Sequence, residues 1–279
     1  MSKAPVAAYF GPHDEGFAAC LMLDMRARGL DVRSVRDIGS EPIGGLMVIR
    51  SWFADQANFA AESSAVFSTH HVRRLVVRRN ETKIHRDEGF GGWSHLALWS
   101  DYYQPVRSLG GKGAGGIGHV LKLFVGKPVD LDLPNGYVFV SYHHRGDGVF
   151  VREWLRPILA LAGITSWDYR MSERIPDPTT AEVLDPGIAR RLGELIGSAG
   201  ALLVVATDSW SSPYSRFELQ TARELGIPVI AVRSTDTVPS ADAVLDGLPI
   251  MIVRSDRSRA PKLISALRIA GVQPWGERR

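Results

Sequence analysis

The amino-acid sequence predicts an α/β fold made of two units, each a parallel sheet with helices on both faces. Two observations predict the fold class: apolar runs alternate along the chain with segments of helical periodicity, and these runs are apolar at consecutive positions, as in strands buried on both faces. A third observation predicts the division. A break rich in proline and glycine spans 126–136, so we expect one unit over 1–127, a linker over 128–136 and a second unit over 137–279.

The first unit is expected to contain five strands and three helices. The predicted strands are rich in β-branched and other apolar residues, and they span 6–10, 30–35, 45–49, 72–77 and 95–99. The predicted helices have apolar residues at helical spacing, and they span 17–28, 58–68 and 117–125. Gly29 is placed to end the first of these helices.

The second unit repeats this order of elements. Its predicted strands span 137–142, 164–169, 201–206, 227–232 and 249–253, and its predicted helices span 149–162, 188–196, 216–225 and 261–269. Asp185 and Pro186 read as the N-cap and first residue of the helix over 188–196. Pro157 falls inside the first helical run and is expected to kink or break it. Because both halves share the order of elements, we expect the first unit to be a degenerate copy of the second.

Composition excludes several classes of protein. The chain has 279 residues, 45% hydrophobic and 23% charged, as in soluble globular proteins of one or two domains. Its single cysteine, Cys20, rules out an intrachain disulfide and fits a reducing compartment. No apolar run reaches the ~18 residues that a transmembrane helix needs, and the N-terminus lacks the features of a signal peptide. We therefore expect a cytoplasmic protein with no membrane contact, and a net charge of +3 does not indicate nucleic acid binding.

Two motifs in the second unit carry a family resemblance. The segment VFVSYHHRGDGVFVREWL, which starts at Val138, is an apolar strand ending in Ser-Tyr, followed by an acidic residue and a helix. The segment SPYSRFE, from Ser212 to Glu218, places a glutamate after a turn rich in serine. Over about 136–272 the chain resembles Toll/interleukin-1 receptor (TIR) domains of the bacterial antiphage type. This resemblance implies a flavodoxin-like fold for the second unit.

The resemblance also implies an activity. In enzymatic TIR domains the glutamate that matches Glu218 is catalytic in cleaving the nicotinamide–ribose bond of NAD+. Cleavage builds positive charge on the ribose, which a carboxylate can stabilise. The residues expected to bind substrate around Glu218 are Tyr142, His143, Asp168, Ser212, Tyr214 and Ser215. We expect Tyr214 to stack on nicotinamide and Ser212 or Ser215 to contact the ribose.

The resemblance implies partners as well. NAD+ would be the substrate, with no further cofactor and no metal, and the product would be ADP-ribose or a cyclic isomer. The TIR domains would self-associate, and a partner defence protein or activator would belong to the system. Three departures stand out: Asp147 comes one residue later than the family acid, tyrosine and serine replace tryptophan and cysteine in the second motif, and the segment 170–185, which matches the family's BB loop, is long.

Other interpretations stay open at this point. Many TIR domains are scaffolds without catalytic activity, so a non-enzymatic tandem TIR module is the main alternative. Glu218 also has a purely structural explanation, because acidic residues are favoured in the first turn of a helix. In the first unit, a glycine-rich segment over 110–118 resembles a phosphate-binding loop. It lacks the strand and the Ser or Thr of the Walker motif, which favours an ordinary loop.

Overall fold

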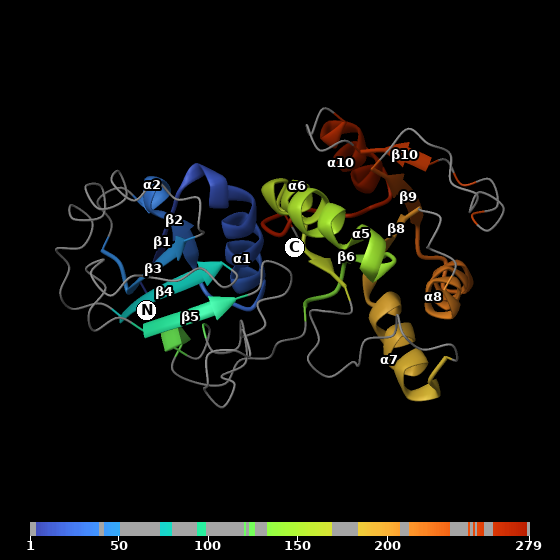
Figure 1. The fold of residues 1–279 in the computed structure, drawn as a ribbon, viewed down its shortest axis with the longest axis horizontal. Coiled ribbons are helices and arrows are strands. Elements are labelled where there is room, and N and C mark those ends of the chain that lie inside the picture. The colour runs from blue at the N-terminus through green and yellow to red at the C-terminus, as the bar shows by residue number, and fades with distance from the viewer. Residues whose placement is uncertain are drawn as a thin grey trace. The chain divides into compact units, whose positions relative to one another are not determined.

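The chain divides into two compact units, Met1–Asp132 and Leu133–Arg279, in a computed structural model (Figure 1). The division falls inside the segment over 128–136 that was expected to be a linker. The residues that the structure describes are 4–38, 42–50, 73–79, 94–98, 120, 123–125, 133–168, 184–206, 212–234, 245, 248, 250–253 and 259–277. The predicted helix over 58–68, the glycine-rich segment over 110–118 and most of the segment over 170–185 lie outside them.

The first unit contains a five-stranded parallel sheet in the order β2-β1-β3-β4-β5. Its strands are β1 (Val6–Phe10), β2 (Val32–Ser34), β3 (Gly45–Arg50), β4 (Arg73–Arg79) and β5 (Ser94–Leu98). The short 3-10 helix η1 (Pro12–Asp14) and the helix α1 (Glu15–Ala27) follow β1, and α2 (Val35–Ile38) follows β2. All five predicted strands are present, with ends shifted by up to two residues.

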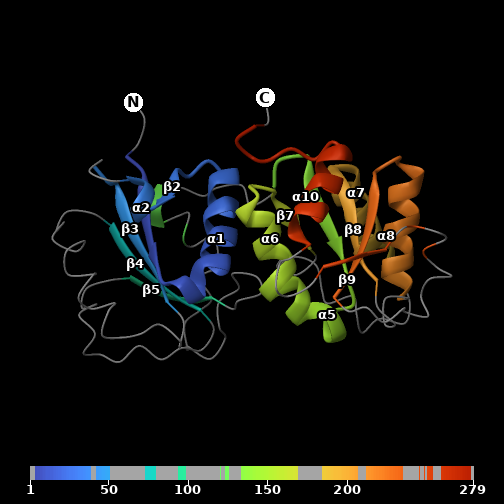
Figure 2. The ribbon, with the colours of Figure 1, turned by 90° about the horizontal axis from the view of Figure 1, so that it is seen from above.

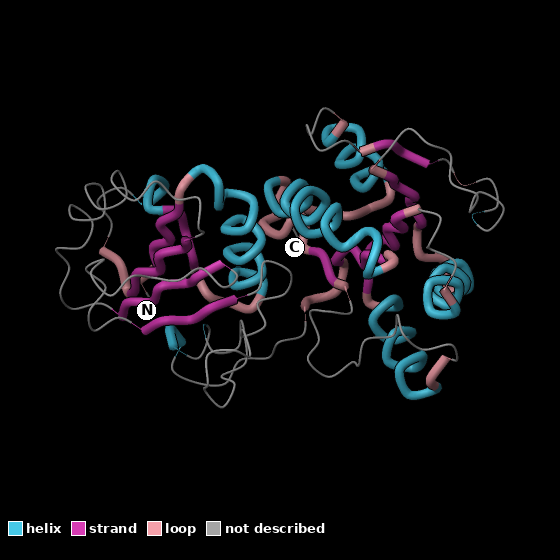
Figure 3. The backbone as a smooth tube through the Cα atoms, viewed as in Figure 1, coloured by secondary structure: helices cyan, strands magenta, loops and turns pink. Residues whose placement is uncertain are grey.

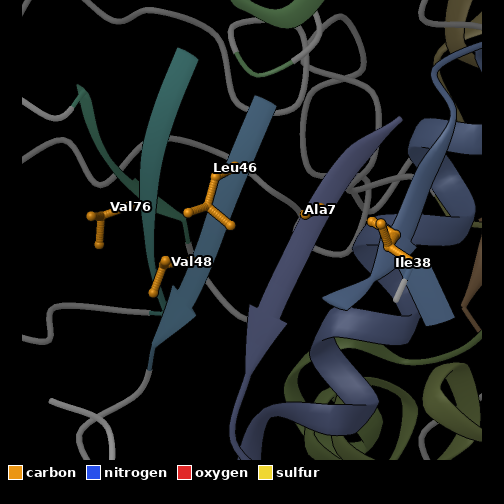
Figure 4. Close-up of a cluster of buried hydrophobic side chains, with 5 residues drawn as sticks. All are labelled: Ala7, Ile38, Leu46, Val48 and Val76. Carbon is orange, nitrogen blue, oxygen red and sulfur yellow. The ribbon is translucent and has the colours of Figure 1, made fainter. Parts of the chain in front are cut away.

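Alternate side chains along each strand point to the same face of this sheet, where they meet the side chains of the neighbouring strands. Ala7 lies opposite Leu46, and Val48 lies opposite Val76. These four residues and Ile38 form a buried apolar cluster (Figure 4). The cluster follows from the period of two along a strand, which places alternate side chains on the same face.

The second unit contains a five-stranded parallel sheet in the order β10-β9-β8-β6-β7. Its strands are β6 (Tyr137–Ser141), β7 (Ser166–Trp167), β8 (Ala199–Val205), β9 (Val229–Arg233) and β10 (Ile250–Ile252). Numbered within each unit, both sheets have the order 2-1-3-4-5, which is the flavodoxin-like arrangement. The prediction of two parallel α/β units is confirmed, and Figure 3 shows both sheets in magenta.

Helices cover both faces of the second sheet. They are α5 (His144–Phe150), α6 (Arg156–Leu161), α7 (Pro186–Gly197), α8 (Pro213–Glu224) and α10 (Ala260–Ile269). In Figure 2, α6 and α10 lie on one face of the sheet and α7 and α8 on the other. Asp185 caps α7 as predicted, since its side chain accepts a hydrogen bond from the Ile188 N–H at 2.9 Å.

Pro157 changes the helix around it without ending it. The helical run continues from α5 to α6 through a π-helical turn over Val151–Leu155, where the Arg156 N–H donates to the Val151 carbonyl. A proline inside a helix has no N–H, and its ring crowds the carbonyl four residues earlier. The wider π turn directly before Pro157 is the kind of distortion that accommodates such a residue.

The strand expected over 164–169 is much shorter than predicted, because β7 contains only Ser166 and Trp167. The chain is still closing α6 at the start of this segment. Gly163 has a φ of +73°, and the Ile164 N–H donates to the Leu159 carbonyl at 2.9 Å. This left-handed helix ending uses residues that an apolar pattern alone assigns to the strand.

Candidate active site

The candidate site lies at the carboxyl edge of the second sheet, where open α/β sheets bind their ligands. Tyr142 and His143 follow β6, Asp168 follows β7, and α8 begins after β8. Phe139 lies opposite Trp167 in the β6–β7 pair, so Asp168 comes directly beyond the last paired residue of β7. The topology therefore brings three of the predicted site segments to one edge of the sheet.

A serine pair starts the helix that carries the glutamate. Ser212 is the N-cap of α8, and its Oγ accepts a hydrogen bond from the Ser215 N–H at 3.1 Å. The Ser212 and Ser215 hydroxyls are 2.8 Å apart and hydrogen-bonded to each other. This cap and Pro213 extend the helix three residues earlier than predicted. Both serines predicted to contact ribose thus take part in the capping of α8.

Glu218 is not in the first turn of α8. The helix begins at Pro213, Glu218 is its sixth residue, and the first turn contains no acidic residue. A helix dipole acts on charges within the first turn, so it does not account for a glutamate at this position. The structural explanation offered by the sequence is therefore wrong.

The Glu218 side chain is buried, with 7% of the residue exposed. The Ser141 hydroxyl, at the end of β6, donates a hydrogen bond to its Oε2. Ser141 itself is 1% exposed. The contact joins residues 77 positions apart in the chain and connects α8 to β6, an interior strand of the sheet.

Burial keeps Glu218 protonated at neutral pH. Loss of solvent raises its pKa from 4.5 to about 8, the Ser141 hydrogen bond opposes that rise, and the negative charge of Asp168 adds to it. Asp168 is fully buried. Among the described residues, Glu218 forms no ion pair with a cation, so the carboxyl is not held as part of a buried salt bridge. Strongly perturbed acids of this kind cluster at functional sites.

Ser141 is the residue that the sequence analysis missed. Ser141 is the serine of the Ser-Tyr pair that ends the apolar strand, and the two residues after it were expected to bind substrate. Tyr142 is buried, whereas His143 is half-buried, at the N-cap of α5. The His143 Nδ1 atom is buried and has no hydrogen-bond partner in the part of the chain that the structure describes.

Tyr214 lies in the interior of the second unit. It is 3% exposed. Its hydroxyl accepts a hydrogen bond from the Asp185 N–H at 3.0 Å. Asp185 caps α7, so Tyr214 connects the start of α8 to the start of α7.

Replacing Tyr214 with phenylalanine is expected to destabilise the chain by about 1–2 kcal/mol, because the Asp185 N–H loses its hydrogen-bond partner. The ring itself is kept, so a role limited to stacking would leave stability unchanged. Chemical denaturation of the wild type and Tyr214→Phe measures the difference. Equal unfolding free energies would contradict the connecting role.

The described residues offer no obvious metal centre. Across those ranges, no group of three or more His, Cys, Asp or Glu side chains is arranged to hold a metal ion. None of the described helices combines the length and apolar character needed to cross a membrane.

Comparison with known proteins adds no relative. No protein-family model matches the sequence, and no curated protein matches it. The features of the chain that indicate a function are the two sequence motifs and the geometry around Glu218.

Proposed function

We propose that the chain is a bacterial TIR-domain NAD+ glycohydrolase with Glu218 as its catalytic residue. The observation that carries this proposal is the Glu218 carboxyl itself. It is buried at the ligand-binding edge of a flavodoxin-like sheet, hydrogen-bonded to Ser141 and without a described cation beside it. A carboxyl whose charge is costly to bury, and which no described cation pairs with, is better explained by function than by stability. The TIR resemblance supplies the substrate.

The chemistry fits a lone buried carboxylate. As the bond between the ribose C1′ and the nicotinamide nitrogen breaks, its electron pair moves to the positively charged ring, which leaves as neutral nicotinamide. The ribose gains oxocarbenium character, and the Glu218 carboxylate stabilises it. Water then adds at C1′ and loses a proton, which gives ADP-ribose. Attack by an adenine nitrogen of the same molecule, with loss of a proton where that nitrogen carries one, gives a cyclic isomer.

The burial of Glu218 supports activation by assembly. A substrate can reach the carboxyl only after the groups that cover it rearrange, and TIR pockets are often completed across subunits. The TIR resemblance also suggests a role in antiphage immunity, in the cytoplasm, with a partner protein as activator.

A direct test incubates the purified chain with NAD+ over a range of protein concentrations, with and without a crowding agent, and measures released nicotinamide. The proposal expects release to rise faster than protein concentration. Full activity in a dilute monomer would contradict activation by assembly. The absence of nicotinamide release under all conditions would contradict the proposed enzymatic activity.

The pH dependence of kcat/KM is expected to rise with pH and to level off above about pH 8. The pKa of Glu218 in the free protein is about 8, and kcat/KM reports the ionisation of the free enzyme. The rise of kcat with pH is expected to have a lower apparent pKa than the rise of kcat/KM. The reason is that the positively charged nicotinamide ring favours the carboxylate in the complex. Initial rates between pH 5.5 and 9.5 measure the pH dependence of both kcat and kcat/KM. A profile that falls over this range would exclude a catalytic carboxylate.

A second candidate function is a non-enzymatic tandem TIR scaffold. One observation favours it: Leu161 and Ile269, on α6 and α10, are 48% and 85% exposed. A groove of about 450 Å³ lies between these helices and is lined by Ile158, Leu161 and Ile264 among others. Exposed apolar side chains beside a groove are typical of interaction surfaces. Self-association without nicotinamide release would favour this alternative.

A further inference from the structure

We propose that Ser141 and Asp168 are positioning residues that act on Glu218 in opposite directions. The Ser141 hydroxyl holds Glu218 as the carboxylate, and the Asp168 charge favours the protonated acid. This inference rests on the proposed function, because it describes how the catalytic group of that function is kept ready.

Ser141 has the geometry of an orienting group. It is the last residue of β6, which lies between β8 and β7 in the sheet, and it is almost fully buried, so its position is determined by the sheet. Its hydroxyl donates to one carboxylate oxygen of Glu218, Oε2. A hydrogen bond donated to an ionised group is stronger than one donated to a neutral group. Ser141 therefore both orients the carboxyl and stabilises its charged form.

Asp168 has the opposite effect from the other side of β6. It follows β7, the edge strand that pairs with β6, and it is fully buried. A second negative charge in a buried site disfavours ionisation of the first. Asp168 contributes to the raised pKa of Glu218, after burial as the largest cause.

Other polar and ionisable side chains lie on the described segments at this edge. Tyr214 and Ser215 lie on α8 itself, and their hydroxyls are hydrogen-bonded to Asp185 and Ser212 respectively. The segment that follows β6 carries His143 and the buried Asp147, and Asp185 lies at the start of α7. Among the described residues, Ser141 and Asp168 are the ones that affect the pKa of Glu218, in addition to its burial.

The two opposing effects suit a substrate with a positively charged leaving group. In the free protein at pH 7, with a pKa of about 8, roughly one Glu218 in ten is ionised. An arriving nicotinamide cation acts in the same direction as Ser141 and against Asp168. Substrate binding then favours loss of the proton, so that at pH 7 a larger share of Glu218 is ionised when the substrate is present.

The test compares pH profiles of nicotinamide release for three variants. Ser141→Ala is expected to raise the apparent pKa in the pH profile of kcat/KM by about one pH unit. This corresponds to roughly a tenfold loss of kcat/KM at pH 7. Ser141→Thr keeps the hydroxyl and is expected to keep the apparent pKa of the wild type. Asp168→Asn is expected to lower the apparent pKa in this profile by about one pH unit. Ser198→Ala, whose hydroxyl donates to the Glu194 carbonyl on α7, is the matched control.

A second readout does not depend on activity. Unfolding free energies measured against pH report the ionisation of Glu218 through linkage. In the wild type the pH-dependent loss of stability is expected to end near pH 8. It is expected to end near pH 9 in Ser141→Ala and near pH 7 in Asp168→Asn.

The two readouts separate two kinds of failure. If the wild type releases no nicotinamide, the proposed function fails, and the stability profiles still decide whether Ser141 and Asp168 act on Glu218. If the wild type is active but both variants keep its profiles, only the present inference is overturned. Shifts of both variants in the same direction would also overturn it.

Discussion

Replacing Glu218 with glutamine is expected to reduce nicotinamide release from NAD+ by about 10²–10³-fold, the usual cost of removing a group that stabilises charge in a transition state. Glutamine has nearly the same shape and can still accept a hydrogen bond from Ser141, so the fold and the hydroxyl contact are preserved. What it lacks is the negative charge that opposes the cation on the ribose. Initial rates at pH 8.5, where the wild-type carboxyl is mostly ionised, show the largest difference.

The same helix provides a matched control. Glu224 is exposed at the end of α8, where it accepts a hydrogen bond from Gln220 at 2.8 Å. Glu224→Gln makes the same chemical change at an exposed residue six positions along the same helix, about 9 Å along its axis. It is expected to retain wild-type activity. Comparable rates in wild type and Glu218→Gln would contradict a catalytic Glu218.

Glu218→Gln is also expected to stabilise the second unit at alkaline pH. In the wild type the folded pKa is about 8, above the ordinary value of 4.5. As pH rises from 4.5 to 8, the unfolded chain loses its proton while the folded chain keeps it, so the unfolding free energy falls. The total loss is up to roughly 5 kcal/mol. Glutamine cannot ionise, so the variant does not undergo this loss.

Urea denaturation at pH 5 and pH 9 measures this effect. The stability of Glu218→Gln relative to wild type is expected to be greater at pH 9 than at pH 5. A structural carboxylate would behave in the opposite way, because its loss removes a favourable charge interaction at high pH. Lower stability of the variant at pH 9 would therefore show that Glu218 contributes to the fold.

Much of the fold could be predicted from local patterns. Strands buried on both faces of a parallel sheet must be apolar at consecutive positions, which makes β1, β3, β6 and β8 visible in the sequence. The N-cap of α7 was also visible, because Asp185 directly precedes Pro186. These features depend only on neighbouring residues.

The rest depends on contacts between distant residues. The hydrogen bond from Ser141 to Glu218 spans 77 positions, and no local pattern distinguishes Ser141 from Tyr142 as the partner of the glutamate. The shortness of β7 has a similar cause, because Gly163 and Ile164 are used to end α6. The motif containing Tyr214 suggested stacking on substrate, whereas the position of α7 makes its hydroxyl a buried connection to Asp185.

Product analysis tests the central claim most directly. Wild-type protein is incubated with NAD+ at pH 8.5 under conditions that favour assembly, and all nucleotide products are quantified by mass spectrometry beside Glu218→Gln. The proposal predicts one nicotinamide for each NAD+ consumed by the wild type, together with ADP-ribose or its cyclic isomer, and almost no turnover by the variant. Intact NAD+, cleavage at the pyrophosphate, or equal turnover by the two proteins would contradict it.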